Sequence, residues 1–421
     1  MTVPLGPRTV NRVPECSATP PCPHFGSCGG CQLQDLSYAA QLDLKSARLR
    51  TLLDATDIAL PELQLHPSPP LAYRNRIRLT LAEVDGQLRA GYLTPTPPEL
   101  SNREPRTSNP VFLPITQCPI ATPILWRATE AFLALLNQAP TSWRRNPRQI
   151  PDQLELFTTA DESRLQLTLS LRTAMKSLPK KLAADFSTLC EYLLPRVPQL
   201  SGAGIALLPP HCAARSRRVE QPHPGPTWGA PGLNYTVAPL EPRTLNLEPQ
   251  TYWVPRGAFF QINRFLLPEL LALVTLNRTG QQAFDLYAGV GLFSRALAAR
   301  FAHVTAVEIA EPAFTALTRT KLSTLHGIQA TTLDFLRSAV LQRDRPDLIV
   351  LDPPRSGAGP EVCTLLARIA APTLIYVSCS PEALPADLIT LATSGYTLAE
   401  LHLFDLFPQT THIETLAILT R

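Results

Sequence analysis

The sequence predicts an α/β protein whose C-terminal part, residues 246–421, is a doubly wound, Rossmann-like domain. A strand-like run at 282–286 leads into the glycine-containing loop 287–291 and then into a helix-like stretch. A second strand-like run ends at Glu308, and strand and helix patterns alternate from there to the last residue. Such alternation is typical of a parallel sheet covered by helices on both faces. The chemistry is therefore expected at the carboxyl ends of these strands.

Composition sets only broad limits. The chain has 421 residues, of which 45% are hydrophobic and 17% charged, and this predicts two or three domains. The net charge of +4 permits an anionic partner without requiring one. The start of the chain does not resemble a secretion signal, and the longest apolar stretch, 265–276, contains Glu269. We therefore expect a cytoplasmic protein with no membrane partner, whose nine cysteines are thiols, metal ligands or catalysts rather than disulfides.

Four segments are expected along the chain, the last of which is the Rossmann-like domain 246–421. Residues 1–20 are polar and proline-rich and predict a flexible lead-in, and 21–70 predict a cysteine loop and a helix. Residues 71–245 predict a central α+β domain. Its expected elements are hairpins turning at 85–86 and 160–163, helices over 122–138 and 178–194, and a linker with irregular strand over 217–248.

The loop 287–291 predicts a cofactor site. Glycines let the backbone approach a ligand closely, and Glu308, about twenty residues later, suits hydrogen bonds to two ribose hydroxyls. The loop lacks the full dinucleotide fingerprint and a phosphate-binding lysine, which favours S-adenosylmethionine over NAD. Asp334 is expected to close a third strand and accept from the adenine amino group, the alternative being a helix cap.

A thiol in this setting indicates a particular chemistry. Cys379 lies near the end of the strand-like run 373–380 and follows the sequence DPPR, residues 352–355. Methylation of oxygen or nitrogen needs no thiol, whereas carbon-5 of a pyrimidine becomes nucleophilic only after something adds to carbon-6. Glu414 begins an expected closing strand, which would place Cys379 and Glu414 on neighbouring strands. Arg355 is interpreted either as a partner for substrate oxygens or as half of a structural ion pair.

Cysteines also gather near the start. Cys22, Cys28 and Cys31 share a ten-residue, glycine-rich stretch whose spacing lets a tight loop turn three thiolates toward one point. Such loops bind metals. Four other cysteines have no motif around them and are interpreted as core or surface thiols: Cys16, Cys190, Cys212 and Cys363.

The chain resembles the iron-sulfur-containing RNA uracil-C5 methyltransferases, which form 5-methyluridine in tRNA and 23S rRNA. The resemblance covers nearly the whole chain. It is carried by the cysteine loop 22–31 and by these motifs: QCPI at 117–120, FQIN at 260–263, DLYAGVG at 285–291, DPPR at 352–355, VSCSP at 377–381 and HIE at 412–414.

The resemblance implies a mechanism and two sets of ligands. Cys379 would add to carbon-6 of a flipped uridine, and Glu414 would remove the carbon-5 proton after methyl transfer. A [4Fe-4S] cluster would be held by Cys22, Cys28, Cys31 and Cys118, although zinc also accepts four thiolates. The residues expected to contact S-adenosylmethionine are Gln261, Tyr287, Glu308, Asp334 and Asp352. The expected partner is RNA, with 23S rRNA favoured and tRNA as the alternative, and we expect a monomer.

Some features depart from this resemblance. Ala288 and Leu292 stand where many relatives have a cysteine and an asparagine, which removes one polar contact to the methionine part of the cofactor. We expect no small RNA-binding barrel before Cys22, so RNA capture is expected to rest on the central domain and the cysteine loop. Three arginines on one strand face would form a phosphate-binding row or a solvated face: Arg74, Arg76 and Arg78.

Two other classes of protein stay open on the sequence. One is a methyltransferase acting on an amino nitrogen, which would not need Cys379. The other is a cluster-bearing RNA-binding protein whose methyltransferase half is degenerate; Ala288 and Leu292 support this reading, and the pairing of Cys379 with Glu414 opposes it.

Overall fold

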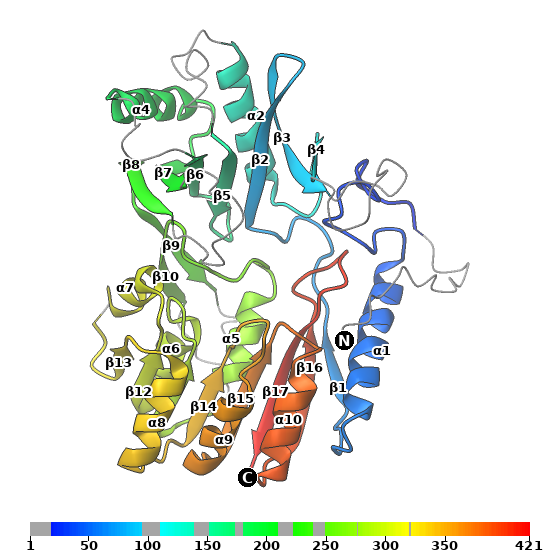
Figure 1. Ribbon diagram of the computed structural model, residues 1–421, viewed down its shortest axis with the longest axis vertical. Helices are drawn as coiled ribbons and strands as arrows, with labels where there is room; N and C mark the ends of the chain where they lie inside the picture. Colours follow the sequence, from blue (N-terminus) through cyan, green and yellow to red (C-terminus); the bar gives the residue numbers. More distant parts are fainter. Residues whose placement is uncertain are drawn as a thin grey trace.

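The computed structural model describes residues 18–94, 110–138, 151–172, 180–208, 222–238, 249–275, 277–319 and 321–421. Most of the expected lead-in, together with Cys16 and Cys212, lies outside these ranges. The described chain forms two large sheets that lie one above the other in Figure 1.

The lower sheet has eight strands among the described residues, in the order β1-β16-β17-β15-β14-β11-β12-β13. All neighbours run parallel except at β17, which is antiparallel to both β15 and β16. The strands are β1 (Leu63–His66), β11 (Gly280–Leu286), β12 (Phe301–Val307), β13 (Leu325–Ile328), β14 (Leu348–Leu351), β15 (Thr373–Ser378), β16 (Thr397–Phe404) and β17 (Glu414–Thr420).

Helices cover both faces of this sheet, which confirms the predicted doubly wound α/β fold. Strand β14, of sequence LIVL, shows why: Leu348 and Val350 belong to one buried cluster, while Ile349 and Leu351 belong to another. A strand buried on both faces needs a continuous apolar run. The first cluster contains α5 (Leu267–Thr275), α6 (Leu292–Leu297) and α7 (Glu311–Arg319); the second contains α1 (Tyr38–Asp54), α8 (Thr332–Gln342), α9 (Pro360–Ile369) and α10 (Leu384–Thr393).

The edge strand β1 was not predicted. It comes from the N-terminal segment that was expected to hold a cysteine loop and a helix, and it pairs in parallel with β16, from Leu63 opposite Leu401 to His66 opposite Phe404. Residues more than 330 apart in sequence are thereby joined in one sheet, and α1 is brought against the C-terminal strands (Figure 1).

The upper sheet has seven strands in the described part of the chain, in the order β4-β3-β2-β5-β6-β7-β8, and only β6 and β7 are parallel. Both predicted hairpins are present; at the first, Asp85 and Gly86 take the positive φ values of 51° and 70° that a tight two-residue turn requires. Helices α2 (Pro123–Gln138) and α4 (Leu182–Leu193) pack on this sheet. The strands are β2 (Arg76–Val84), β3 (Gln87–Thr94), β4 (Val111–Pro114), β5 (Gln153–Thr158), β6 (Leu165–Arg172), β7 (Leu200–Leu208) and β8 (His223–Gly229).

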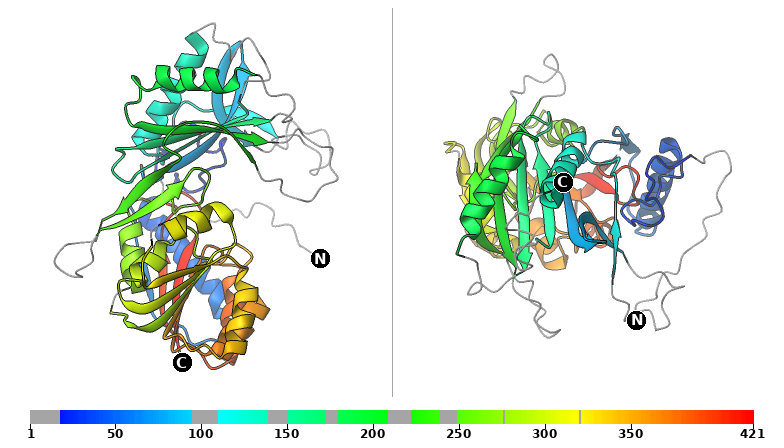
Figure 2. Two further views of the ribbon diagram at one scale, coloured as in Figure 1. Left: turned by 90° about the vertical axis from the view of Figure 1, so that its left-hand side faces the viewer. Right: turned by 90° about the horizontal axis from the view of Figure 1, so that it is seen from above.

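A two-stranded ribbon lies at the junction of the two sheets (Figure 2). Strands β9 (Gly232–Val237) and β10 (Gln250–Pro255) pair antiparallel, with Tyr235 opposite Tyr252. This pairing crosses the boundary expected at residue 246. None of the helices described here has both the length and the apolar character needed to cross a bilayer.

Candidate active site and cysteine-lined cavity

The ends of β15 and β17 bring the predicted nucleophile and base together. The antiparallel register pairs Ser378 with Thr415, and one residue further along lie Cys379 and Glu414. Directly opposed residues of an antiparallel pair point to the same face. Asp352 follows β14, the parallel neighbour of β15, so all three side chains meet at one edge of the sheet.

The electrostatics of this edge disfavour negative charge. Burial raises the pKa of the Cys379 thiol to about 11, the charges of Glu414 and Asp352 add to the shift, and Arg355 opposes it. Burial and the charge of Asp352 raise the pKa of Glu414 well above its ordinary value, again opposed by Arg355. A carboxylate with a raised pKa is a stronger base near neutral pH, which suits proton removal from carbon.

The glycine loop after β11 is tied to the end of β12. The Gly289 amide donates to Oε2 of Glu308 at 2.8 Å, and the Ala310 amide donates to Oε1 at 2.6 Å. Gly291 caps α6 at a φ of 88°, and a Cβ there would come within 2.6 Å of a Leu317 methyl carbon. Tyr287 also has a positive φ, 62°, which in a bulky residue marks a constrained backbone. The predicted cofactor loop is thus a tight turn with a carboxylate beside it.

Gln261 is a further predicted cofactor contact, and its side chain is buried. The backbone carbonyl oxygen of Gln261 accepts from Nδ2 of Asn75 at 3.1 Å, and the backbone amide of Asn75 donates to the backbone carbonyl of Ile262 at 3.0 Å. The FQIN motif is therefore held by the start of the upper sheet.

Asp285 was not singled out from the sequence as a site residue. It is buried in β11, and Ser294 on α6 donates a hydrogen bond to its Oδ2. Burial raises its pKa to about 7, and burial together with Asp285 raises the pKa of Asp352 to about 7 as well. An acidic residue within the buried end of a strand, AFDL at 283–286, was the signal available in the sequence.

Asp334 does not close a strand, and that expectation is wrong. The third strand, β13, ends at Ile328, and Asp334 lies in the first turn of α8. The hydroxyl of Thr331 accepts from the Asp334 amide at 3.1 Å and donates to its Oδ2 at 2.6 Å. Thr331 is thus the N-cap of α8, so local helix capping outweighs strand continuation here.

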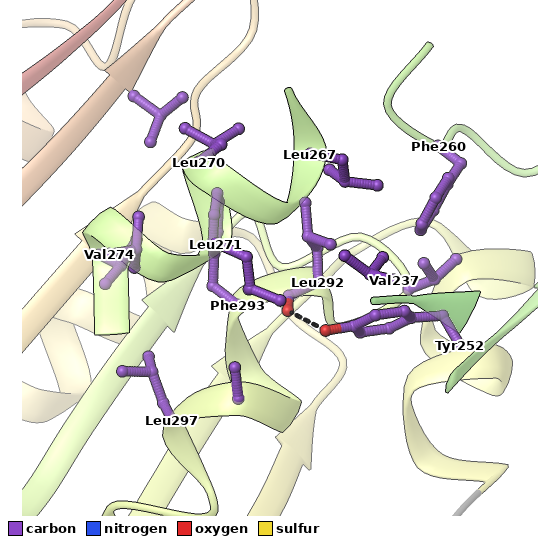
Figure 3. Packing of buried hydrophobic residues seen from close by; sticks show 14 of the residues in the cluster. Val237, Tyr252, Phe260, Leu267, Leu270, Leu271, Val274, Leu292, Phe293 and Leu297 are labelled. Carbon is purple, nitrogen blue, oxygen red and sulfur yellow. Dashed lines mark hydrogen bonds between the residues drawn. The ribbon is translucent and has the colours of Figure 1, made fainter. Parts of the chain in front are cut away.

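The two departures from the family pattern are apolar packing positions. Leu292 and Ala288 are both 7% exposed. Leu292 packs in the buried cluster of α5 and α6, and its carbonyl accepts from the Tyr252 hydroxyl at 2.9 Å (Figure 3). Ala288 packs against Leu317. Core contacts therefore account for both residue types.

The four predicted cluster cysteines line a single cavity of about 150 Å³: Cys22, Cys28, Cys31 and Cys118. Three come from the loop before α1, and Cys118 comes from the segment after β4. Burial raises the pKa of Cys118 to about 11, and Cys31 and Cys28 contribute to the shift through their charges. Within the described ranges, no three side chains of His, Cys, Asp or Glu gather tightly enough to hold a single metal ion.

The arginine row lies on one face of its strand but is not a free phosphate-binding row. The Arg76 guanidinium stacks 4.2 Å above the Phe157 ring and donates to the Ala258 carbonyl at 2.6 Å. Arg78 forms an ion pair with Glu155 at 2.5 Å. Arg74 turns back to the Arg76 carbonyl and borders the cysteine-lined cavity. The row therefore matches neither the free phosphate-binding row nor the solvated face that were expected, because Arg76 is held by Phe157 and Ala258 and Arg78 is paired with Glu155.

A doubly wound sheet with a tight glycine loop after one strand and a carboxylate after the next defines the class of enzymes that bind a nucleoside-containing cofactor. Comparison with known proteins specifies the family. The family model tRNA (Uracil-5-)-methyltransferase matches residues 244–421.

Relatives extend the match to nearly the full chain. The 23S rRNA (uracil(1939)-C(5))-methyltransferase RlmD of Chromohalobacter salexigens is 31% identical over 415 residues, which are 96% of this chain and 76% of that protein. The 23S rRNA (uracil(747)-C(5))-methyltransferase RlmC of Xenorhabdus nematophila is 27% identical, with 94% of this chain and 97% of that protein covered.

The solved Pyrococcus abyssi tRNA (uracil-54, C5)-methyltransferase in complex with S-adenosyl-L-homocysteine has the same fold. Its TM-score is 0.66 at 21% identity, and the match covers 93% of this chain and 86% of that one. The chain belongs to the RNA uracil-5 methyltransferase family and is an S-adenosylmethionine-dependent RNA (uracil-5-)-methyltransferase. This assignment excludes the reading as an amino-nitrogen methyltransferase.

Proposed function

We propose that the enzyme methylates one uridine of 23S rRNA, with Cys379 as the nucleophile and Glu414 as the base. The observation that carries the chemical part is the register of β15 and β17, which sets these two side chains side by side next to Asp352. The names of the two bacterial relatives support 23S rRNA. The names of the family model and of the solved structure support tRNA as the alternative.

The reaction begins at carbon-6 of the uracil. The Cys379 thiol loses its proton to solvent as its sulfur bonds to carbon-6, and the electrons of the carbon-5–carbon-6 double bond move onto carbon-5 and the neighbouring carbonyl. Bound S-adenosylmethionine supplies the methyl group that carbon-5 takes up. Glu414 then takes the proton from carbon-5, the double bond re-forms, and the bond from carbon-6 to sulfur breaks.

The cofactor pocket would be formed by Gln261, Tyr287, Glu308, Asp334 and Asp352. The residues around the glycine loop fit the ligand, because Glu308 accepts an amide hydrogen bond from that loop and directly follows β12, where a ribose would lie. Asp334 lies in the first turn of α8 and not at the end of a strand. Its place in this pocket therefore rests on the family resemblance alone.

The cysteine-lined cavity would hold a [4Fe-4S] cluster, with Cys22, Cys28, Cys31 and Cys118 as the ligands. Four thiols on one cavity match the ligand set of such a cluster. Zinc takes the same ligand set and is the alternative. We further propose that residues 71–245 and the cysteine loop form the RNA-binding part of the enzyme.

Tritium release tests the function. The RNA is labelled at carbon-5 of uridine and incubated with the enzyme and S-adenosylmethionine, using 23S rRNA in one reaction and bulk tRNA in the other. Release from 23S rRNA alone supports the proposal, release from tRNA alone reassigns the substrate, and release by Cys379→Ala would contradict the nucleophile.

A further inference from the structure

The loop between β16 and β17, residues 405–413, ends at the proposed base and is held by the N-terminal segment. We propose that the residues following the cysteine loop hold the 405–413 loop in the position that Glu414 needs. Within that loop, Gln409 is a positioning residue for Glu414. This inference rests on the proposed role of Glu414.

Gln409 is held in an unfavourable backbone conformation. Its φ is 69°, in the left-handed region that non-glycine residues rarely adopt, and the residue is 6% exposed. Gln41 of α1 forms a reciprocal pair with it: Nε2 of Gln41 donates to Oε1 of Gln409 at 3.0 Å, and Oε1 of Gln41 accepts from the Gln409 amide at 2.9 Å. A conformation of this kind persists when its surroundings enforce it.

The same residue is bonded to the cysteine loop. The Gln409 carbonyl accepts two hydrogen bonds, from the amides of Gln32 at 3.0 Å and Leu33 at 3.1 Å. Oε1 of Gln32 accepts from the Thr411 amide at 3.3 Å. Gln32 directly follows Cys31, which lines the cysteine cavity. The residue that bonds the 405–413 loop is therefore the sequence neighbour of a cysteine that lines the cavity.

A buried ion pair fixes the start of the loop. Nζ of Lys45 lies 2.5 Å from Oδ1 of Asp405, with side chains 1% and 0% exposed, and it also donates to the Phe407 carbonyl at 3.0 Å. The Tyr73 hydroxyl donates to the Pro408 carbonyl at 3.1 Å. Removing one partner of such a pair leaves a buried charge unpaired, so variants of Lys45 and Asp405 report mainly on folding.

The timing of the base predicts a specific defect. Glu414 acts after methyl transfer, so a loosened loop slows proton removal from carbon-5 and leaves sulfur addition and methyl transfer intact. The methylated RNA would then stay covalently bound to Cys379. A general loss of structure would slow all steps together.

The test is a single-turnover experiment at saturating RNA with the cluster-loaded full-length enzyme. Methyl incorporation, tritium release from carbon-5 and denaturation-resistant enzyme–RNA complex are followed in parallel for the wild type, Gln41→Ala, Gln409→Ala and Gln409→Glu. In the two alanine variants we expect unchanged methyl incorporation, release slowed about tenfold to a hundredfold, and accumulated complex. Gln409→Glu keeps an acceptor for Nε2 of Gln41 and should release tritium faster than Gln409→Ala.

Two controls separate the possible failures. Gln342→Ala removes an exposed glutamine of α8 and should change nothing. Glu414→Gln should accumulate the complex whatever holds the loop; if it does not, the proposed role of Glu414 is wrong. If it does, but the alanine variants slow both steps equally or slow neither, the positioning role of Gln409 is wrong.

A second readout does not depend on activity. Backbone hydrogen exchange over residues 405–413 should become faster in Gln409→Ala at unchanged iron content, and faster in the wild-type protein after the metal is removed by a chelator. Unchanged exchange after chelation would contradict the link between the cysteine loop and the base.

Discussion

The carboxylate of Glu308 accepts a hydrogen bond from the Gly289 amide, with 2.8 Å between Oε2 and nitrogen. This contact joins the loop after β11 to the end of β12, across the two strands between which a nucleoside would bind. It also keeps the second carboxylate oxygen near the backbone, where the Ala310 amide reaches it.

Glu308→Ala is expected to weaken S-adenosylmethionine binding roughly tenfold to a hundredfold, because a hydrogen bond to a charged group contributes about 1.5–3 kcal/mol. Calorimetric titration of each variant with S-adenosylmethionine measures the dissociation constant. Glu311→Ala, at the exposed start of α7, is the matched control. Equal affinities of both variants and the wild type for S-adenosylmethionine would show that Glu308 does not contribute to cofactor binding.

Alkylation of Cys379 should accelerate as pH rises well beyond the range of an ordinary thiol, because burial raises its pKa to about 11 and the thiolate is the reactive form. Glu414→Gln removes a neighbouring negative charge, so it lowers that pKa and speeds alkylation at a fixed pH. Peptide mapping after iodoacetamide treatment follows Cys379 separately from the other cysteines. An alkylation rate that stays unchanged in Glu414→Gln would show that Glu414 does not act on the Cys379 thiol.

Asp352→Asn should stabilise the protein in alkaline buffer. Burial and Asp285 raise the pKa of Asp352 from 3.8 to about 7, so its contribution to stability is present below the unfolded pKa and is lost as pH rises through the folded one. Between about pH 5.5 and about pH 8 the wild type should lose on the order of a few kcal/mol relative to the variant. Thermal unfolding at both pH values checks this, with the exposed Asp43→Asn as control. A pH-independent difference would contradict the shift.

Metal analysis distinguishes a [4Fe-4S] cluster from zinc as the occupant of the cysteine-lined cavity. Anaerobically purified protein should contain about four iron and about four sulfide per chain, and Cys118→Ser should lower both. Cys190→Ala, a buried thiol of α4 outside the cavity, should leave them unchanged. One equivalent of zinc in place of iron would support the alternative.

Elements with strong local signals were predictable from the sequence. The turn at Asp85 and Gly86 follows from residues that tolerate positive φ, and the β14 strand follows from its apolar run. The neighbouring placement of Cys379 and Glu414 followed from the expected closing strand. For the turn and for β14, the pattern and its consequence lie within a few residues of each other.

Features that depend on distant partners were not predictable. The four residues of β1 are a strand only because β16 lies beside them. Asp334 was misplaced because its hydrogen bonds with Thr331 cap a helix where a strand end was expected. The pairs Gln41–Gln409 and Lys45–Asp405 join residues 368 and 360 apart, so no local pattern indicates them.

The most direct test of the central claim uses RNA that contains 5-fluorouridine, in which the carbon-5 substituent cannot leave as a proton. Enzyme, S-adenosylmethionine and this RNA should give a complex that survives denaturation, and peptide mapping should locate the nucleotide on Cys379. The control Cys190→Ala should form the complex normally, since this thiol is buried in α4 within the core of the upper sheet. A complex that also forms with Cys379→Ala, or no complex with an enzyme that methylates ordinary RNA, would contradict the covalent mechanism.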